Sequence, residues 1–367
     1  MAHVGHHVGH HAHHVPAAPA ADANAVILAT AGYGDKIRFW EALSGICYRT
    51  IQHTNSHVNA LAITTDKRFL AAAGHGSVRL YDLVHPTNSP ILALDAAHPN
   101  ANVTALGFQR DGAWMFTGSE DGTVRVWDLR APPGSAAGAS SGGSGAGASG
   151  GGAPSAGCQR NYSHRGGAVN SVVLHPNQAE LASGTQAGSI KIWDLTANAC
   201  SHELVPEEHT PIRSLHISAD GAHLAAANDG GRTYVWRFYE RPPQAMALPD
   251  QPPEAAELIP LAAVQAHNRY ILRCLFSPDV RYLATTSADH TVRLFDVANN
   301  FTQVRPPLTG HRRWVWDCAF SADSAYLVTA SSDKTARLWD LSTGETIRTY
   351  TGHEKGCTSI ALNDYGQ

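Results

Sequence analysis

The sequence predicts an all-β protein in which seven four-stranded blades form a closed ring, a seven-bladed β-propeller. Two observations lead to this prediction: a short aromatic segment recurs seven times along the chain, and a histidine lies ahead of each expected inner strand. Short alternating apolar segments and turns such as Asp111-Gly112 complete the rhythm of an all-β array. Such a repeat decides the architecture, because each unit buries its apolar faces only against its neighbours.

The recurring segment has the form TVRVWDL at 123–129 and TARLWDL at 335–341. Four of the six intervals between its aromatic residues are 41 to 46 residues long, which fits the ~40–45-residue period of a WD-repeat blade. The two longer intervals contain insertions. The seven aromatic positions are Trp40, Tyr81, Trp127, Trp193, Trp236, Phe295 and Trp339.

The second landmark is the histidine that precedes each inner strand. These histidines are His53, His98, His164, His209, His267, His311 and His353. In such a blade we expect one hydrogen-bonded network of histidine, turn aspartate, strand Ser or Thr and strand tryptophan, because buried polar groups must be satisfied together.

The turn aspartate, six residues before the aromatic, occurs only in the third, sixth and seventh blades, and we expect these blades to be the more rigid. The other four blades have Gly34, His75, Ala187 and Gly230 at this position. The predicted network residues are His98, Asp121, Trp127, His267, Asp289, His311, Asp333 and Trp339. The hydroxyl partner in each blade is one of a pair: Thr117 or Ser119, Thr285 or Ser287, Thr329 or Ser331.

The chain begins in the middle of a blade. AVILATAGY and KIRFWEA are predicted as its second and third strands, and GICYRTIQH as its outer strand. The missing inner strand is GCTSIAL at 356–362. We therefore expect the C-terminal strand to pair into the first blade and close the ring, which leaves no open edge for aggregation.

The propeller is expected to span residues 25–367. Residues 1–24, which contain seven histidines, are interpreted as a disordered tail without a metal site, because nothing there organises a closed coordination shell. The Gly/Ser-rich stretch 131–157 is predicted as a flexible insertion between the third and fourth strands of the third blade, or just after them. A second flexible insertion, rich in proline and glutamate, is predicted at 239–260.

Composition excludes several classes of function. With 27 basic and 31 acidic residues the chain has a net charge of −4, which does not favour nucleic acid as a partner. It has no apolar run long enough to span a membrane and no secretory signal, and its six scattered cysteines favour reduced thiols. The absence of P-loop, GxSxG and HExxH motifs favours a non-enzymatic protein without a cofactor.

One rim of the ring is predicted to bind a partner. The repeat register places there the residues that open each inner strand and the residue before each turn-aspartate position. In the first, sixth and seventh blades these include the aromatic residues Tyr33, Tyr270, Trp314 and Trp316. Aromatic residues of this kind dominate binding hot spots. The predicted rim residues are Trp314, Trp316, Tyr270, Leu272, Tyr33, Thr358, His57 and Asn59. The alternative is that Trp314 and Trp316 plug the channel as core, although the adjacent Arg312-Arg313 favours exposure.

The chain resembles the G-beta-like WD-repeat subunits of the target-of-rapamycin (TOR) kinase complexes. The resemblance runs from about residue 26 to 365 and rests on the stretches 27–53, 111–130, 174–181 and 314–345, of which SGICYRTIQH and HPNQAEL are not generic repeat residues. The His-rich tail, the Gly/Ser insertion and Gly34-Asp35 depart from the family pattern.

The resemblance implies a non-catalytic scaffold subunit that docks on the carboxyl-terminal lobe of the TOR kinase domain and stabilises it in growth and nutrient signalling. It implies raptor- or rictor-like subunits in the same complexes. It also implies a cytoplasmic location, with peripheral attachment to endomembranes through the kinase complex.

Two alternative binding functions are a substrate receptor of a ubiquitin ligase and a G-protein β subunit. Trp127-Asp128-Leu129-Arg130 fits the WDxR pattern with which substrate receptors of cullin-type ubiquitin ligases reach their adaptor. A heterotrimeric G-protein β subunit would need an N-terminal coiled coil, and residues 1–24 have no apolar heptads. Co-purification distinguishes a TOR complex subunit from a ubiquitin-ligase receptor, because the first should recover a very large kinase polypeptide and the second a cullin adaptor.

Overall fold

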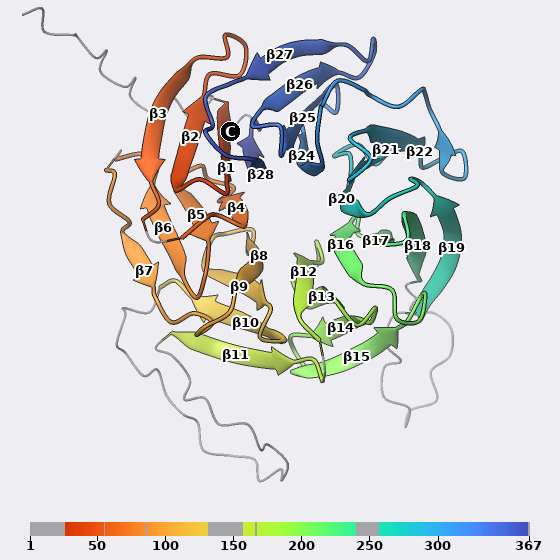
Figure 1. Ribbon diagram of the computed structural model, residues 1–367. Coiled ribbons are helices and arrows are strands. Elements are labelled where there is room, and N and C mark those ends of the chain that lie inside the picture. Colours follow the sequence, from red (N-terminus) through yellow and green to blue (C-terminus); the bar gives the residue numbers. More distant parts are fainter. Residues whose placement is uncertain are drawn as a thin grey trace, which may run out of the picture.

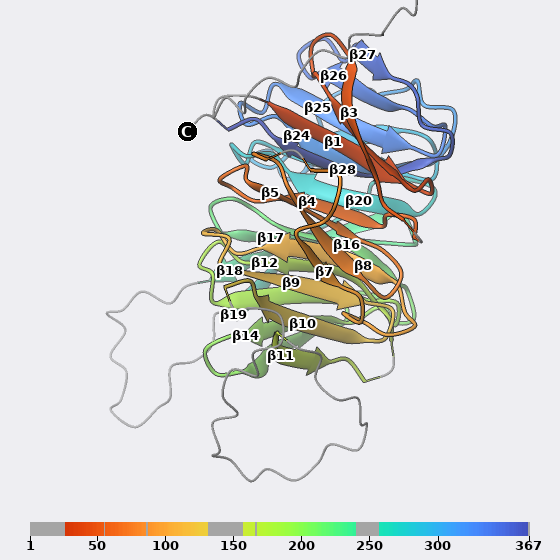
Figure 2. The same ribbon diagram turned by 90° about the vertical axis from the view of Figure 1, so that its left-hand side faces the viewer.

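A computed structural model of the protein describes residues 26–130, 157–239 and 257–365, apart from Asn55, Pro86 and Gly166. In these residues, 28 strands form seven four-stranded antiparallel sheets. The sheets are arranged radially around a central axis (Figure 1), and the ring seen from its side is a thick disc (Figure 2). The predicted seven-bladed β-propeller is therefore confirmed.

The strands follow the chain around the ring, and each blade is described from its inner to its outer strand. Blade one contains β28 (Cys357–Asn363), β1 (Ile27–Gly32), β2 (Lys36–Trp40) and β3 (Cys47–Gln52). Blade two contains β4 (Ala60–Ile63), β5 (Phe69–Ala73), β6 (Val78–Asp82) and β7 (Leu92–Leu94). Blade three contains β8 (Val103–Phe108), β9 (Trp114–Ser119), β10 (Thr123–Asp128) and β11 (Cys158–Ser163). Blade four contains β12 (Val169–Leu174), β13 (Glu180–Thr185), β14 (Ile190–Asp194) and β15 (Ala199–Leu204).

The remaining three blades complete the ring. Blade five contains β16 (Ile212–Ile217), β17 (His223–Asn228), β18 (Arg232–Tyr239) and β19 (Glu257–Gln265). Blade six contains β20 (Ile271–Phe276), β21 (Tyr282–Ser287), β22 (Val292–Asp296) and β23 (Thr302–Gln303). Blade seven contains β24 (Val315–Phe320), β25 (Tyr326–Ser331), β26 (Ala336–Asp340) and β27 (Thr346–Tyr350).

The ring closes as the sequence predicts. β28 pairs with β1 in an antiparallel register that sets Ala29 opposite Ala361, so the two ends of the chain share blade one (Figure 1). The Tyr350 hydroxyl of blade seven also donates to the Ala42 carbonyl, at 2.6 Å. The C-terminal strand β28 supplies the inner strand that blade one would otherwise lack. The edge of β1 is therefore paired and not open.

The apolar core lies between the blades. Within the described residues, seven clusters of buried apolar side chains each join one blade to the next. At the junction of blades seven and one, for example, Trp40 packs with Leu338 and Tyr350. Because each blade is buried only against its two neighbours, the disc behaves as a ring of equivalent junctions.

The second insertion is shorter than predicted. Residue 239 and residues 257–260 belong to strands, with Tyr239 opposite Glu257 and Trp236 opposite Pro260. Two physical reasons explain the error: Leu258 packs against the core between blades four and five, and an outer strand tolerates a proline at a bulge because its free edge faces solvent.

The other predicted insertion joins β10 to β11, so it falls between the third and fourth strands of blade three. The expectations for residues 1–24, and for 131–157 apart from Gly157, lie outside the described residues. Where the structure is described, no helix has the length and hydrophobicity to cross a membrane.

A candidate partner-binding rim

A β-bulge near the start of the inner strand positions the side chains at the mouth of the central channel. In blade seven the register between β24 and β25 shifts between Val315 and Asp317, so Trp316 has no partner opposite. Such a bulge takes a residue out of the strict alternation and re-aims its side chain. The corresponding unpaired residues, all lining the channel, are Thr104, Asn170, Arg213, Leu272, Trp316 and Thr358.

Five rings form a continuous row across four neighbouring blades, which we call the aromatic rim: His57, Tyr33, Trp316, Trp314 and Tyr270. Successive ring centroids are 6.0, 6.0, 5.7 and 6.3 Å apart. Tyr33 meets Trp316 edge-on at 82°, and Tyr270 meets Trp314 at 89°. Edge-to-face contacts of this kind are favourable and hold the rings in fixed orientations.

The aromatic rim lies at the surface. Tyr33, Tyr270 and Trp314 are 45%, 47% and 37% exposed, whereas the five tryptophans of the recurring aromatic segment are at most 6% exposed. Trp316 is half-buried and donates its indole N–H to the Ser332 hydroxyl, at 2.6 Å. Trp314 is therefore not a core residue, and Trp316 joins the exposed row to the wall of the channel.

The other three predicted rim residues contribute differently. Leu272 lines the channel beside Trp316. Thr358 and Asn59 bond to the adjacent blade: the Thr358 hydroxyl donates to the Val58 carbonyl and the Asn59 amide to the Val103 carbonyl, each at 3.1 Å. These two side chains tie neighbouring inner strands together as well as lying at the rim.

The opposite side of the mouth is polar and satisfies itself. Asn102 donates to Glu120 at 2.9 Å, and Asn170 to Gln186 at 3.1 Å. The Arg213 guanidinium makes two hydrogen bonds to Asp229, at 2.6 and 2.9 Å. Because these groups already have partners, they present fewer free groups to a binding partner than the aromatic side does.

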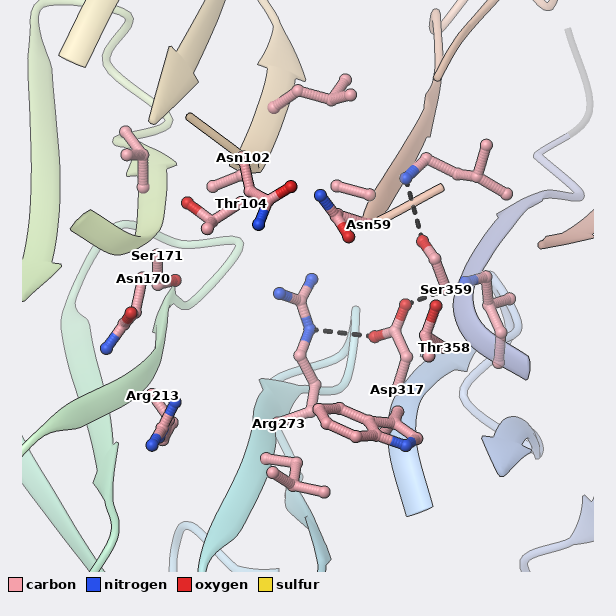
Figure 3. A pocket seen from close by; sticks show the side chains of 18 of the residues that line it. Asn59, Asn102, Thr104, Asn170, Ser171, Arg213, Arg273, Asp317, Thr358 and Ser359 are labelled. Carbon is pink, nitrogen blue, oxygen red and sulfur yellow. Dashed lines mark hydrogen bonds and ion pairs between the residues drawn. The ribbon is translucent and has the colours of Figure 1, made fainter. Parts of the chain in front are cut away.

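The wall of the channel holds a charged pair that the sequence analysis missed. Arg273 lies 3.2 Å from Asp317, and Figure 3 shows the two side chains meeting between the inner strands of neighbouring blades, near Ser359. Asp317 also accepts the backbone N–H groups of Ile360 and Cys318. Burial raises the pKa of Asp317, although Arg273 and the two N–H groups oppose the rise. The only sign of this pair in the sequence is a charged residue, Asp317, inside an expected inner strand.

The expected hydrogen-bonded network is complete in blades three and seven. In blade seven the Trp339 indole donates to Thr329, Thr329 meets Nε2 of His311, and Nδ1 of His311 meets Asp333, each at 2.8 Å. The corresponding distances in blade three, from Trp127 through Thr117 and His98 to Asp121, are 3.0, 2.7 and 2.8 Å. The indole can only donate and the carboxylate can only accept. Each hydrogen bond is therefore donated in the same direction: from tryptophan to threonine, from threonine to histidine and from histidine to aspartate.

Threonine fills the hydroxyl position in all three blades that have the aspartate: Thr117, Thr285 and Thr329. The alternative serines instead accept the backbone N–H of the turn aspartate. In blade six the Phe295 side chain has no N–H to donate, so the network is limited to Thr285, His267 and Asp289. Burial would raise the pKa of Asp121, but the hydrogen bonds from His98 and Thr123 lower it to about 2.

Blades one, two and four have the histidine without the aspartate. Each histidine is hydrogen-bonded to a hydroxyl. Nε2 of His353 lies 2.8 Å from the Thr30 hydroxyl and Nε2 of His164 lies 2.7 Å from the Ser183 hydroxyl. In blade two, Nδ1 of His53 lies 3.2 Å from the Tyr81 hydroxyl. Burial lowers the pKa of each of these three histidines to about 4. Nδ1 of His164 is buried without a hydrogen-bond partner among the described residues, in the position where the aspartate would bind.

Blade five departs from the predicted pattern. His209, expected at the buried histidine position, is exposed and has a left-handed backbone with φ of 58°. Glu207 takes over the role, because it accepts the Asn228 amide at 2.8 Å and the Tyr234 hydroxyl at 3.0 Å. The histidine therefore occupies the expected buried position in six blades, and the expectation was wrong for blade five.

The repeated blades and their internal networks define a WD-repeat protein whose exposed aromatic surface is suited to binding another protein. The family model described as "WD domain, G-beta repeat" matches residues 45–82, 89–128, 156–194, 199–237, 259–296 and 302–340.

The curated relatives narrow this class. The chain is 50% identical to "Target of rapamycin complex subunit wat1" of Schizosaccharomyces pombe over 93% of this chain and 97% of the relative. It is 48% identical to "Target of rapamycin complex subunit LST8" of Saccharomyces cerevisiae over 92% and 99% of the two chains, and 44% identical to the Bos taurus protein of that name over 92% and 95%. The chain belongs to this family of target of rapamycin complex subunits.

Proposed function

We propose that this protein is a non-catalytic scaffold subunit of TOR complexes that docks on the carboxyl-terminal lobe of the kinase domain and stabilises it. The observation that carries the proposal is the aromatic rim, five contacting rings on one face of a rigid disc. The names of the relatives supply the class of partner. Raptor- or rictor-like subunits would complete the assembly, in the cytoplasm or on endomembranes.

The geometry of the rim favours tight binding. Tryptophan and tyrosine are the residue types that carry most of the binding energy at protein interfaces. The rings of Tyr33, Trp314 and Trp316 are held by one another and by Ser332, so they lose little freedom when a partner covers them. A subunit that binds only the ordered kinase domain stabilises that domain by mass action.

A ubiquitin-ligase receptor is the second function considered, and the structure favours it less. The Arg130 guanidinium folds back onto Asp128, two residues earlier, with distances of 3.1 and 3.2 Å. An adaptor would have to compete with that contact. The similarity to TOR complex subunits, by contrast, extends over most of the chain.

Co-purification tests the proposal. The full chain, expressed with a C-terminal affinity tag in its host, is captured from a lysate, and its partners are identified by mass spectrometry. We expect the TOR kinase to be recovered in near-stoichiometric amount. Recovery of a cullin adaptor without the kinase would reject the proposal in favour of the ligase function, and an Arg130→Ala variant would then lose the adaptor.

A further inference from the structure

Charge is distributed unevenly around the face that carries the aromatic rim. In blades six, seven and one, exposed basic side chains flank the rings on the loops before the inner strands and on one strand turn. These residues are Arg269, Arg312, Arg313, Lys334 and Lys355. Within the described residues, none of the five forms an ion pair.

Three of the acidic residues of the same sector are already engaged. Asp289 and Asp333 accept hydrogen bonds from His267 and His311 inside their blades. Glu354 is paired with Lys36 at 2.8 Å. Asp35, on the turn after Tyr33, is exposed and accepts the neutral Gln52 amide. The charge without an ionic partner in this sector is therefore predominantly positive, with five basic side chains against this carboxylate.

The opposite sector has the reverse balance. Glu120 and Glu208 are exposed there together with one arginine, Arg165, while Arg213 and Arg232 are paired with Asp229 and Glu207. One face of the disc thus combines an aromatic, basic half with a polar, mildly acidic half. A partner with a uniformly charged surface would be repelled by one of the two halves.

From this juxtaposition we propose that the aromatic rim receives an acidic segment of the partner, one that sets apolar side chains on the rings and carboxylates beside Arg312 and Arg313. This inference rests on the proposed function and specifies the chemistry of its docking surface. The rings would supply the affinity. The basic residues would steer the encounter and fix which way round the partner sits, because surface charges change association rates more than they change the strength of the final contact.

The two roles predict different kinetic effects. Charge reversal by Arg312→Glu/Arg313→Glu should lower the association rate constant by about 10-fold at low salt and leave dissociation nearly unchanged. Truncation by Trp314→Ala/Trp316→Ala should mainly accelerate dissociation. The steering effect should fade at high salt, because the Debye length falls to about 3 Å at 1 M ionic strength.

The experiment measures association and dissociation by biolayer interferometry, with the full chain as analyte and immobilised TOR kinase purified from cells depleted of this subunit. Each variant is measured in a series of salt concentrations. Arg165→Glu, a reversal of an exposed arginine in blade four, is the matched control and should change association less than about twofold. Arg312→Gln/Arg313→Gln should give an intermediate rate. All three arginine positions tested are exposed, so the fold is expected to be retained.

Slower, salt-sensitive association confined to the Arg312/Arg313 variants would support the inference. If those variants bind like the unmodified protein while the tryptophan variants dissociate fast, the acidic partner segment is wrong and the docking proposal stands. If neither set of variants changes binding, both fail. If the arginine variants lose binding only to phosphatidylserine-containing vesicles and not to the kinase, the basic residues serve a membrane surface and the inference is overturned.

Discussion

Blade seven contains two kinds of tryptophan, and their difference explains how one repeat provides both stability and binding. Trp339 on β26 is 2% exposed and donates its N–H to Thr329 inside the blade. Trp314, just before β24, is 37% exposed and contacts other rings at the rim. The inner indole completes a buried polar network, whereas the rim indole leaves its apolar surface for a partner. The same side chain is therefore expected to stabilise the fold in one place and an interface in the other.

The largest expected effect comes from removing the inner tryptophan. Trp339→Ala should lower the free energy of unfolding by about 3–5 kcal/mol, because it leaves a cavity and deprives Thr329 of a donor. Urea denaturation measures the loss, with Trp314→Ala as the matched control. Equal losses in the two variants would show that the distinction between the two kinds of tryptophan is wrong.

Acid should destabilise the fold through its buried histidines, including the three that have no aspartate partner. His53, His164 and His353 have a pKa lowered to about 4 by burial, against about 6.5 in the unfolded chain. Between these values the unfolded state binds more protons, so the free energy of unfolding should fall as pH decreases from about 6.5 towards 4.

A second loss should follow below about pH 4. Asp121 has a folded-state pKa lowered to about 2, so its contribution is present above the unfolded value of about 3.9 and is lost as pH falls towards 2. Chemical denaturation from pH 8 to pH 3 checks both phases. A stability that stays constant between pH 6.5 and 4.5 would contradict the assignment of the three histidines as buried and neutral.

Supplying the missing aspartate should stabilise blade four. Ala187 occupies the position of Asp121 in an equivalent turn, and Nδ1 of His164 has no partner there. Ala187→Asp should raise the free energy of unfolding by about 1–2 kcal/mol, because it satisfies a buried donor. Ala187→Asn keeps the size without the charge and should give less. No gain in the thermal midpoint of the aspartate variant would mean that the turn cannot place a carboxylate on His164.

The smallest expected effect concerns the support of the rim. Ser332→Ala removes the hydroxyl that accepts the Trp316 indole N–H. Since Trp316 is half-buried and water can replace the hydroxyl, the loss of stability should be about 0.5–1 kcal/mol, with a moderate loss of kinase affinity. A loss as large as that of Trp339→Ala would place Trp316 with the core tryptophans.

The sequence was informative wherever the structure follows the repeat. The period of the aromatic segment and the displaced inner strand predicted seven blades and their closure, because both depend on local patterns repeated many times. Around the channel the prediction was less complete. A bulge adds one residue to the inner strand and re-aims its side chain, and the repeated segments contain no residue that marks where the bulge falls.

Two further features required the three-dimensional structure. The Arg273–Asp317 pair joins blades six and seven and has no repeat pattern to reveal it. In blade five the backbone of His209 is left-handed and its side chain is exposed, and Glu207 accepts the hydrogen bonds inside the blade instead. This conformation depends on the loop as a whole. Repetition therefore predicted the frame and the network in most blades, and individual contacts decided the rest.

The central claim is that the rim tryptophans bind the kinase without supporting the fold, and a double variant tests it most directly. For Trp314→Ala/Trp316→Ala, thermal unfolding and capture of TOR kinase are measured on one preparation, beside Asn102→Ala/Glu120→Ala on the polar side of the mouth. We predict that the melting temperature of the tryptophan variant falls by only a few degrees, far less than that of Trp339→Ala, and that kinase affinity falls by about 2 kcal/mol or more, roughly 30-fold. The polar control should still capture the kinase. Unchanged melting with full kinase capture by the tryptophan variant would contradict the claim.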